Sequence, residues 1–131
     1  MKKLALLMLM LFMGVGFALA QEKTQIKFDK TEHNFGTFSE SSPVVSATFT
    51  FTNIGKSPLV IHQAVPSCGC TVPEFTQEPV LPGKSGTIKV TYNGEGRFPG
   101  HFKKSITVRT NAEPELVRLY IEGDMVAKAN D

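Results

Sequence analysis

Residues 45–52 alternate strictly between apolar and hydroxyl side chains, and this pattern restricts the fold more than any other feature of the chain. The alternating residues are Val45, Ser46, Ala47, Thr48, Phe49, Thr50, Phe51 and Thr52. Successive side chains of a β-strand point to opposite faces, so one face of this segment is apolar and the other is hydroxylated. The pattern predicts a strand of an antiparallel sheet, with one face in the core and the other in water.

Similar short apolar runs recur along the chain after residue 20, and sequences rich in Gly, Pro and Asn separate them. No window in this part of the chain shows helical periodicity. The predicted strands are residues 25–28, 34–38, 45–52, 59–65, 87–92, 104–110 and 117–122. About seven short strands at this spacing are typical of an all-β sandwich, so we expect a single antiparallel β-sandwich domain.

Residues 1–20 have the features of a secretory signal peptide. Two lysines precede an apolar run at residues 4–13, and the segment ends in Ala-Leu-Ala. The run is shorter than the ~20 residues that a membrane-spanning helix needs. We therefore expect cleavage after residue 20, export to the periplasm or the extracellular space, and a soluble domain formed by residues 21–131.

The charge of residues 21–131 is balanced between basic and acidic side chains. These residues contain no basic run that would attract a nucleic acid or an anionic membrane. They also contain no apolar stretch long enough to cross a membrane. We expect neither nucleic acid as a partner nor a membrane span after cleavage.

The only two cysteines stand one residue apart, as Cys68-Gly69-Cys70. In an exported protein such a pair forms a disulfide or holds a metal. A local structural disulfide, a redox-active pair and a two-thiolate site for copper or zinc all fit the motif. Zinc normally takes four ligands, and His62 on the preceding strand is the weak candidate for a third. Cys-x-Cys lacks the spacing of a thioredoxin-like motif, which disfavours the redox role.

Several motifs together make the chain resemble a bacterial family, domain of unknown function 1573. The motifs are Asn34–Thr37, Phe49–Gly55, Pro58–Ile61, Ser67–Thr71, Pro82–Gly86, Thr110–Asn111 and Ile121–Gly123. The resemblance covers residues 26–126. It implies an immunoglobulin-like fold akin to the sandwich domains of the major sperm protein and cilia-associated groups, together with a location in the cell envelope. It implies no activity.

No Gly-x-Ser-x-Gly turn, phosphate-binding loop or convincing acid–base pair occurs in the sequence, so we do not expect an enzyme. Aromatic residues in or near loops are the other candidates for a site. The predicted contact patch consists of Phe75, Arg97, Phe98, His101 and Phe102. Exposed aromatic and arginine side chains are typical of protein interfaces. The alternative is that these rings cap the open ends of the sandwich.

These observations predict a non-catalytic binding or structural module of the envelope. Its expected partner is another envelope protein or a surface polymer, and no cofactor is expected. The last strand, residues 117–122, could receive a strand from a partner if it lies at a sheet edge. The competing hypotheses are a copper- or zinc-binding protein and a thiol–disulfide redox protein, both of which use Cys68 and Cys70.

Overall fold

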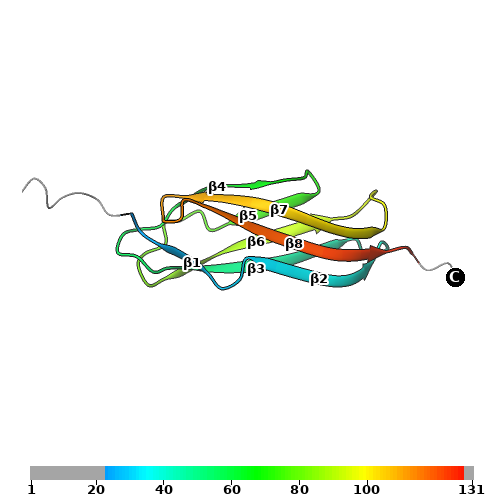
Figure 1. The fold of residues 1–131 in the computed structure, drawn as a ribbon, viewed down its shortest axis with the longest axis horizontal. Coiled ribbons are helices and arrows are strands. Elements are labelled where there is room, and N and C mark those ends of the chain that lie inside the picture. Colours follow the sequence, from blue (N-terminus) through cyan, green and yellow to red (C-terminus); the bar gives the residue numbers. More distant parts are fainter. Residues whose placement is uncertain (1–22, 129–131) are drawn as a thin grey trace, which may run out of the picture.

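A computed structural model describes residues 23–128, which form a sandwich of eight β-strands (Figure 1). The predicted signal peptide lies outside these residues. The strands are β1 (Ile26–Phe28), β2 (Glu32–Ser39), β3 (Val44–Asn53), β4 (Ile61–Pro66), β5 (Thr71–Phe75), β6 (Ser85–Asn93), β7 (Gly100–Thr110) and β8 (Leu116–Val126). None of the described residues forms a helix long and apolar enough to cross a membrane.

The strands form two four-stranded sheets, with the orders β1-β3-β6-β5 and β2-β8-β7-β4. The alternation of β3 points its apolar side chains into the space between the sheets. Phe49 and Phe51 are fully buried there, while the hydroxyls between them face outward. The second sheet contributes buried residues such as Ile106 and Leu119 to the same core. The predicted immunoglobulin-like sandwich is therefore confirmed.

The structure contains one strand, β5, that the sequence pattern did not reveal. It pairs antiparallel with β6 and forms an edge of its sheet. Its five residues include Pro73 and Glu74, which are rare in central strands, so the segment reads as a loop. Edge strands tolerate proline because one side of the strand needs no backbone partner.

The sheets are also not wholly antiparallel, because β2 runs parallel to β8. Only three residues separate β1 from β2, so the chain keeps its direction while it passes from the first sheet to the second (Figure 1). β2 therefore runs in the same direction as β1. Side-chain alternation is the same in parallel and antiparallel edge strands and carries no sign of this.

The last strand is central, which corrects the idea that residues 117–122 offer an open edge. β8 lies between β2 and β7, and both neighbours use its backbone groups. The mixed pairing of β2 is the physical reason, since it covers the side of β8 that a purely consecutive antiparallel sheet would leave open.

Candidate functional site

Three connections meet at one end of the sandwich and carry both sequence candidates, the cysteines and Phe98. We call this region the disulfide end and define it as residues 40–43, 67–70 and 94–99. The Asn93 N–H donates to the Cys70 carbonyl at 2.8 Å, and the Gly94 N–H donates to the Pro43 carbonyl at 2.9 Å. These two bonds tie the β4–β5 turn and the β2–β3 turn to the β6–β7 loop.

Cys68 and Cys70 are joined as a disulfide within the β4–β5 turn, with their Cα atoms 5.2 Å apart. An extended strand would separate these Cα atoms by about 6.5 to 7 Å, so a turn has brought them together. Cys70 is buried and belongs to the core, whereas Cys68 is only partly buried and Gly69 is exposed. The bridge thus has one inner and one outer sulfur.

The turn is held in place by hydrogen bonds that do not involve the S–S bond. The Ser67 N–H donates to the Ser105 carbonyl at 2.9 Å, and the Ser105 N–H donates back to Ser67 Oγ at 3.1 Å. The Thr71 N–H closes the turn on the Cys68 carbonyl at 3.2 Å. Loop-closure entropy for a three-residue loop is worth only about 1.5 kcal/mol. The disulfide therefore adds little stability to a turn that these hydrogen bonds also hold.

His62 does not join the cysteines in a metal site. It is exposed on β4, next to a register irregularity between Ile61 and Gln63. Within residues 23–128, no group of three or more His, Cys, Asp or Glu side chains is arranged to hold a metal ion. Within the same residues, the Cys68 and Cys70 sulfurs are bonded to each other.

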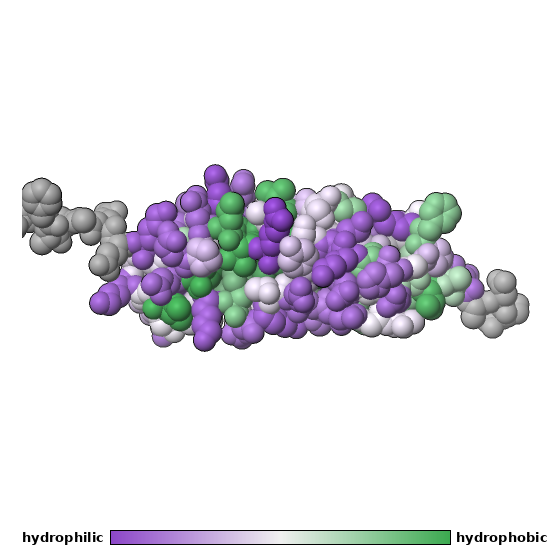
Figure 2. All heavy atoms as spheres, viewed as in Figure 1, coloured by the Kyte–Doolittle hydropathy of each residue, from purple (hydrophilic) through white to green (hydrophobic). Residues whose placement is uncertain are grey.

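Phe98 is the most exposed large apolar side chain of the disulfide end. Its side chain is 97% exposed, on a loop that backbone bonds hold in shape. The Arg97 N–H donates to the Gly94 carbonyl at 3.0 Å, and the Glu95 N–H donates to Asn93 Oδ1 at 2.9 Å. Apolar groups project at this end among mostly hydrophilic neighbours (Figure 2). The loop therefore presents a ring to solvent from an ordered support.

The predicted contact patch is only partly assembled. Phe102 is a core residue, 9% exposed, and stacks on Tyr92 with ring centroids 3.9 Å apart. This corrects its placement on the surface: β7 begins at Gly100, so Phe102 lies within a strand and points inward. Phe75 is half-buried on β5, opposite Ile88. The alternative reading, in which rings cap the sandwich, holds for Phe102.

A further member of the patch, His101, contacts two carboxylates on the neighbouring strand β8. Its Nδ1 lies 3.0 Å from Asp124 Oδ1, and its Nε2 lies 3.5 Å from Glu122 Oε2. All three side chains are on the outer surface of the sheet and are substantially exposed. The imidazole is thus held between two carboxylates on the surface of the sheet. Phe98 and Arg97 are the members of the patch that remain available in the β6–β7 loop.

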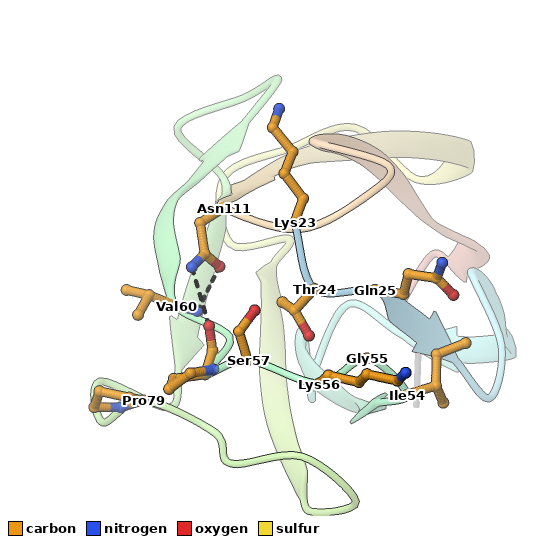
Figure 3. A pocket seen from close by; sticks show the side chains of 11 residues that line it. Lys23, Thr24, Gln25, Ile54, Gly55, Lys56, Ser57, Val60, Pro79 and Asn111 are labelled. Atoms are coloured by element: carbon orange, nitrogen blue, oxygen red, sulfur yellow. Dashed lines mark hydrogen bonds between the residues drawn. The ribbon is translucent and has the colours of Figure 1, made fainter. Parts of the chain in front are cut away.

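An open cleft of about 1030 Å³ lies at the opposite end of the sandwich (Figure 3). Lys23, Lys56, Ser57 and Asn111 line it. The Asn111 amide is occupied, because its Oδ1 accepts from the Val60 N–H and its Nδ2 donates to the Pro58 carbonyl. Sequence reasoning did not find this cleft, since its walls come from segments that are distant along the chain. Its lining shows no catalytic arrangement.

Asn53 is fully buried at the end of β3 and forms hydrogen bonds with three residues that line the cleft. Its Oδ1 accepts from Thr24 Oγ1 at 2.6 Å and from the Gly55 N–H at 3.0 Å. Its Nδ2 donates to the carbonyls of Ser57 and Val80, each at 2.8 Å. Asn53 therefore joins the segment before β1, the β3–β4 loop and the β5–β6 connection, which is a structural role.

Each outer strand of the two sheets carries a feature that opposes strand addition. β1 spans three residues, and the pairing of β2 is irregular around Gly36, which has a φ of 71°. β5 contains Pro73, and β4 has a register irregularity near its start and ends at Pro66. Short strands, bulges and prolines are known protections against edge-to-edge pairing. Loops are thus better candidates for contact than edges.

Comparison with known proteins identifies the family of this chain. The model of the family described as "Protein of unknown function (DUF1573)" matches residues 26–125. The chain belongs to the DUF1573 family. No curated protein matches it significantly.

Solved structures share the fold of this DUF1573 chain at low identity. A protein of unknown function from Porphyromonas gingivalis W83 is similar at 16% identity and a TM-score of 0.68, over 80% of this chain and 50% of that one. The chain thus spans half the length of that protein. PapD-like domain 7 of human CEP192 is similar at 12% identity and a TM-score of 0.64, over 85% of this chain and 92% of that one.

A periplasmic chaperone, SfaE, is also similar, at 12% identity and a TM-score of 0.53, over 79% of this chain and 58% of that one. Likeness at these identities shows the fold alone: the DUF1573 chain has a PapD-like, immunoglobulin-like sandwich. The fold hosts unrelated functions, so the function must be argued from the surface.

Proposed function

We propose that this protein is an exported, non-catalytic binding module of the bacterial cell envelope, which contacts another envelope protein through its disulfide end. The observation that carries the proposal is the 97% exposure of Phe98 on a hydrogen-bonded loop. A ring exposed to water in this way gains free energy when a partner covers it. An ordered loop also loses little conformational entropy on binding.

The surroundings of Phe98 indicate a partner with an apolar pocket beside an acidic group. Arg97 precedes the ring and is exposed, and aromatic and arginine side chains are the most frequent energetic anchors of protein interfaces. A single protruding ring fits a pocket in a protein better than it fits a surface polymer. A polymer would call for a flat row of rings, and the described loop residues 94–99 include only this one.

Site-specific photocrosslinking tests the proposal in cells that express the full-length chain. A photoreactive residue at position 98 should give a discrete crosslinked product with an envelope protein. Position 81 is the matched control, because Leu81 is also exposed (57%) but belongs to the β5–β6 connection. Equal crosslinking at both positions, or none at either, would refute a contact at the disulfide end.

Once the partner is identified, substitution of Phe98 gives a quantitative test. Phe98→Ala should weaken binding by at least about tenfold, as expected for a central aromatic anchor. The thermal midpoint should not change, because the ring touches little of its own domain. Leu81→Ala should leave the affinity unchanged. An unaltered affinity for the Phe98 variant would remove the loop from the interface.

The location is tested separately, by cell fractionation and by intact-mass measurement. The proposal requires that the protein leaves the cytoplasm and that its mass corresponds to a chain starting at Gln21. Retention of the complete chain in the cytoplasm would refute the envelope location but would leave the fold and the Phe98 contact open to their own tests.

A further inference from the structure

The Cys68–Cys70 turn has three properties that a structural disulfide does not need. The first is that hydrogen bonds to neighbouring strands hold it in addition to the S–S bond. Ser67 is held to Ser105 by two hydrogen bonds, and the Cys70 carbonyl accepts from Asn93. The thiols of a reduced turn would therefore stay near each other, ready to form the bond again.

The second property is the unequal exposure of the two sulfurs. Cys70 is 7% exposed and packs in the core, while Cys68 is partly exposed. A Cβ added at Gly69 would meet no atom within 4 Å apart from those of its two chain neighbours, so no other part of the protein covers this side of the turn. Attack on a disulfide requires access to one sulfur along the S–S axis. Access is therefore easier at Cys68 than at Cys70.

The third property is that each sulfur has a hydrogen-bonding neighbour. The Cys70 N–H donates to Cys68 Sγ at 3.1 Å, and Thr71 Oγ1 lies 3.6 Å from Cys70 Sγ. Hydrogen bonds to a sulfur favour its thiolate form. The Thr71 hydroxyl can thus donate to Cys70 when this sulfur leaves as a thiolate.

From these observations we infer that Cys68–Cys70 is a thiol–disulfide exchange site, at which an external thiolate attacks Cys68 and Cys70 is the leaving group. The co-reactant is a dithiol protein or a small thiol. This inference does not depend on the proposed contact of Phe98. It restores the redox role that the Cys-x-Cys spacing alone disfavoured.

The exchange proceeds in two balanced displacements. The thiolate of the co-reactant forms a bond to Cys68 Sγ while the Cys68–Cys70 bond breaks, and its electron pair goes to Cys70, which then takes a proton. A second thiolate of the co-reactant then attacks the sulfur attached to Cys68 and releases the Cys68 thiolate, which is protonated. The protein disulfide is reduced by two electrons, and the co-reactant becomes a disulfide.

Two exposed apolar side chains flank the turn along the chain. Val65 on β4 is 49% exposed, and Val72 on β5 is 54% exposed. They stand on either side of the turn in the sequence, three residues before Cys68 and two after Cys70. They belong to different sheets, and either one can contact a thiol protein that approaches its side of the turn.

Equilibration in glutathione buffers tests the inference on the exported, oxidised protein. The fraction of reduced protein, counted by alkylation and mass spectrometry, should rise reversibly across the series of buffers. The far-ultraviolet circular dichroism spectrum should stay that of the folded domain. Persistence of the disulfide in every buffer, or loss of the spectrum on reduction, would identify a purely structural bridge and overturn the proposal.

Brief exposure to reduced glutathione followed by acid quenching tests which sulfur is attacked. The trapped glutathione adduct should be on Cys68, and an adduct on Cys70 would overturn the assignment. Cys68→Ser/Cys70→Ser is the control, and it should carry no adduct. This measurement uses the unaltered protein, so it does not depend on whether any variant folds.

The role of Thr71 is tested by two substitutions of similar size. Thr71→Val removes the hydroxyl, and reduction by dithiothreitol should become about tenfold slower, as expected for a lost hydrogen bond to a developing charge. Thr71→Ser keeps the hydroxyl and should react at nearly the original rate. Equal rates for the two variants would show that Thr71 only packs beside the bridge.

Discussion

At the scale of single residues, Asn53 is the polar side chain whose removal we expect to lower the stability most. Its amide makes four hydrogen bonds to three different segments of the chain in a fully buried position. A buried donor or acceptor that loses its partner carries the full cost of desolvation. Asn53, the asparagine of the Asn-Ile-Gly motif, thus holds these segments together, although in the sequence it looks like an ordinary turn residue.

We expect Asn53→Ala to lower the free energy of unfolding by about 3 kcal/mol or more, because several buried backbone groups would lose partners. Asn111→Ala is the matched control. Asn111 also bonds two backbone groups, but it is exposed and water can replace it, so the expected loss is about 1 kcal/mol. Urea unfolding measures both, and similar losses would contradict the argument.

His33 should make stability depend on pH. Burial, and then the nearby Lys30 ammonium, lower the pKa of its imidazole from the usual 6.5. The unfolded chain therefore binds a proton at a higher pH than the folded chain, and stability should fall as the pH drops from about 6.5 through the lowered value.

Urea midpoints at pH 7.5 and pH 5 measure this contribution, and His33→Gln should reduce the difference between them. His62→Gln, on the exposed surface of β4, is the matched control and should retain the difference. A pH dependence that His33→Gln leaves unchanged would assign the effect to other groups.

At the scale of strands, β6 shows how closely the packing of neighbouring strands on the buried face of a sheet depends on side-chain size. Gly86 pairs with Phe51 of β3, and a Cβ at this position would lie 2.5 Å from Phe51 Cζ. The ring of Phe51 is fully buried in the core. The glycine is therefore part of the packing of β3 against β6.

Gly86→Ala should destabilise the domain by about 1 to 3 kcal/mol, the usual cost of overpacking a core. Gly69→Ala is the control, because the space around Gly69 is open, and it should change stability by less than about 0.5 kcal/mol. Thermal unfolding compares the two variants. If Gly86→Ala left the stability unchanged, β3 and β6 would move apart more easily than their packing indicates.

At the scale of the whole molecule, the continuous core between the sheets stabilises the domain, and the disulfide contributes little. Cys68→Ser/Cys70→Ser should remain folded at 25 °C, with a thermal midpoint lower by at most about 10 °C. Circular dichroism melts of the oxidised protein and the variant measure the difference. Unfolding of the variant at 25 °C would show that the bridge is essential to the fold.

The sequence alone was enough to predict the layers of the sandwich and seven of its strands. Two-residue alternation is a local property, and burying one face of each strand requires a second sheet. The same reasoning missed β5, because the Pro and Glu that suit an edge strand look like a loop. It also left open which aromatic rings are buried, since Phe98 and Phe102 are only four residues apart.

Only the tertiary structure decided which groups are available to a partner. The switch of the chain between sheets made β8 central, the pairing of β7 turned Phe102 inward, and the β6–β7 loop left Phe98 in solvent. The same assembly placed Cys70 in the core and Cys68 toward water. Strand formation depends on neighbouring residues, so it could be predicted from the sequence. The exposure of a side chain depends on contacts between residues that are distant in the sequence, so only the folded molecule reveals it.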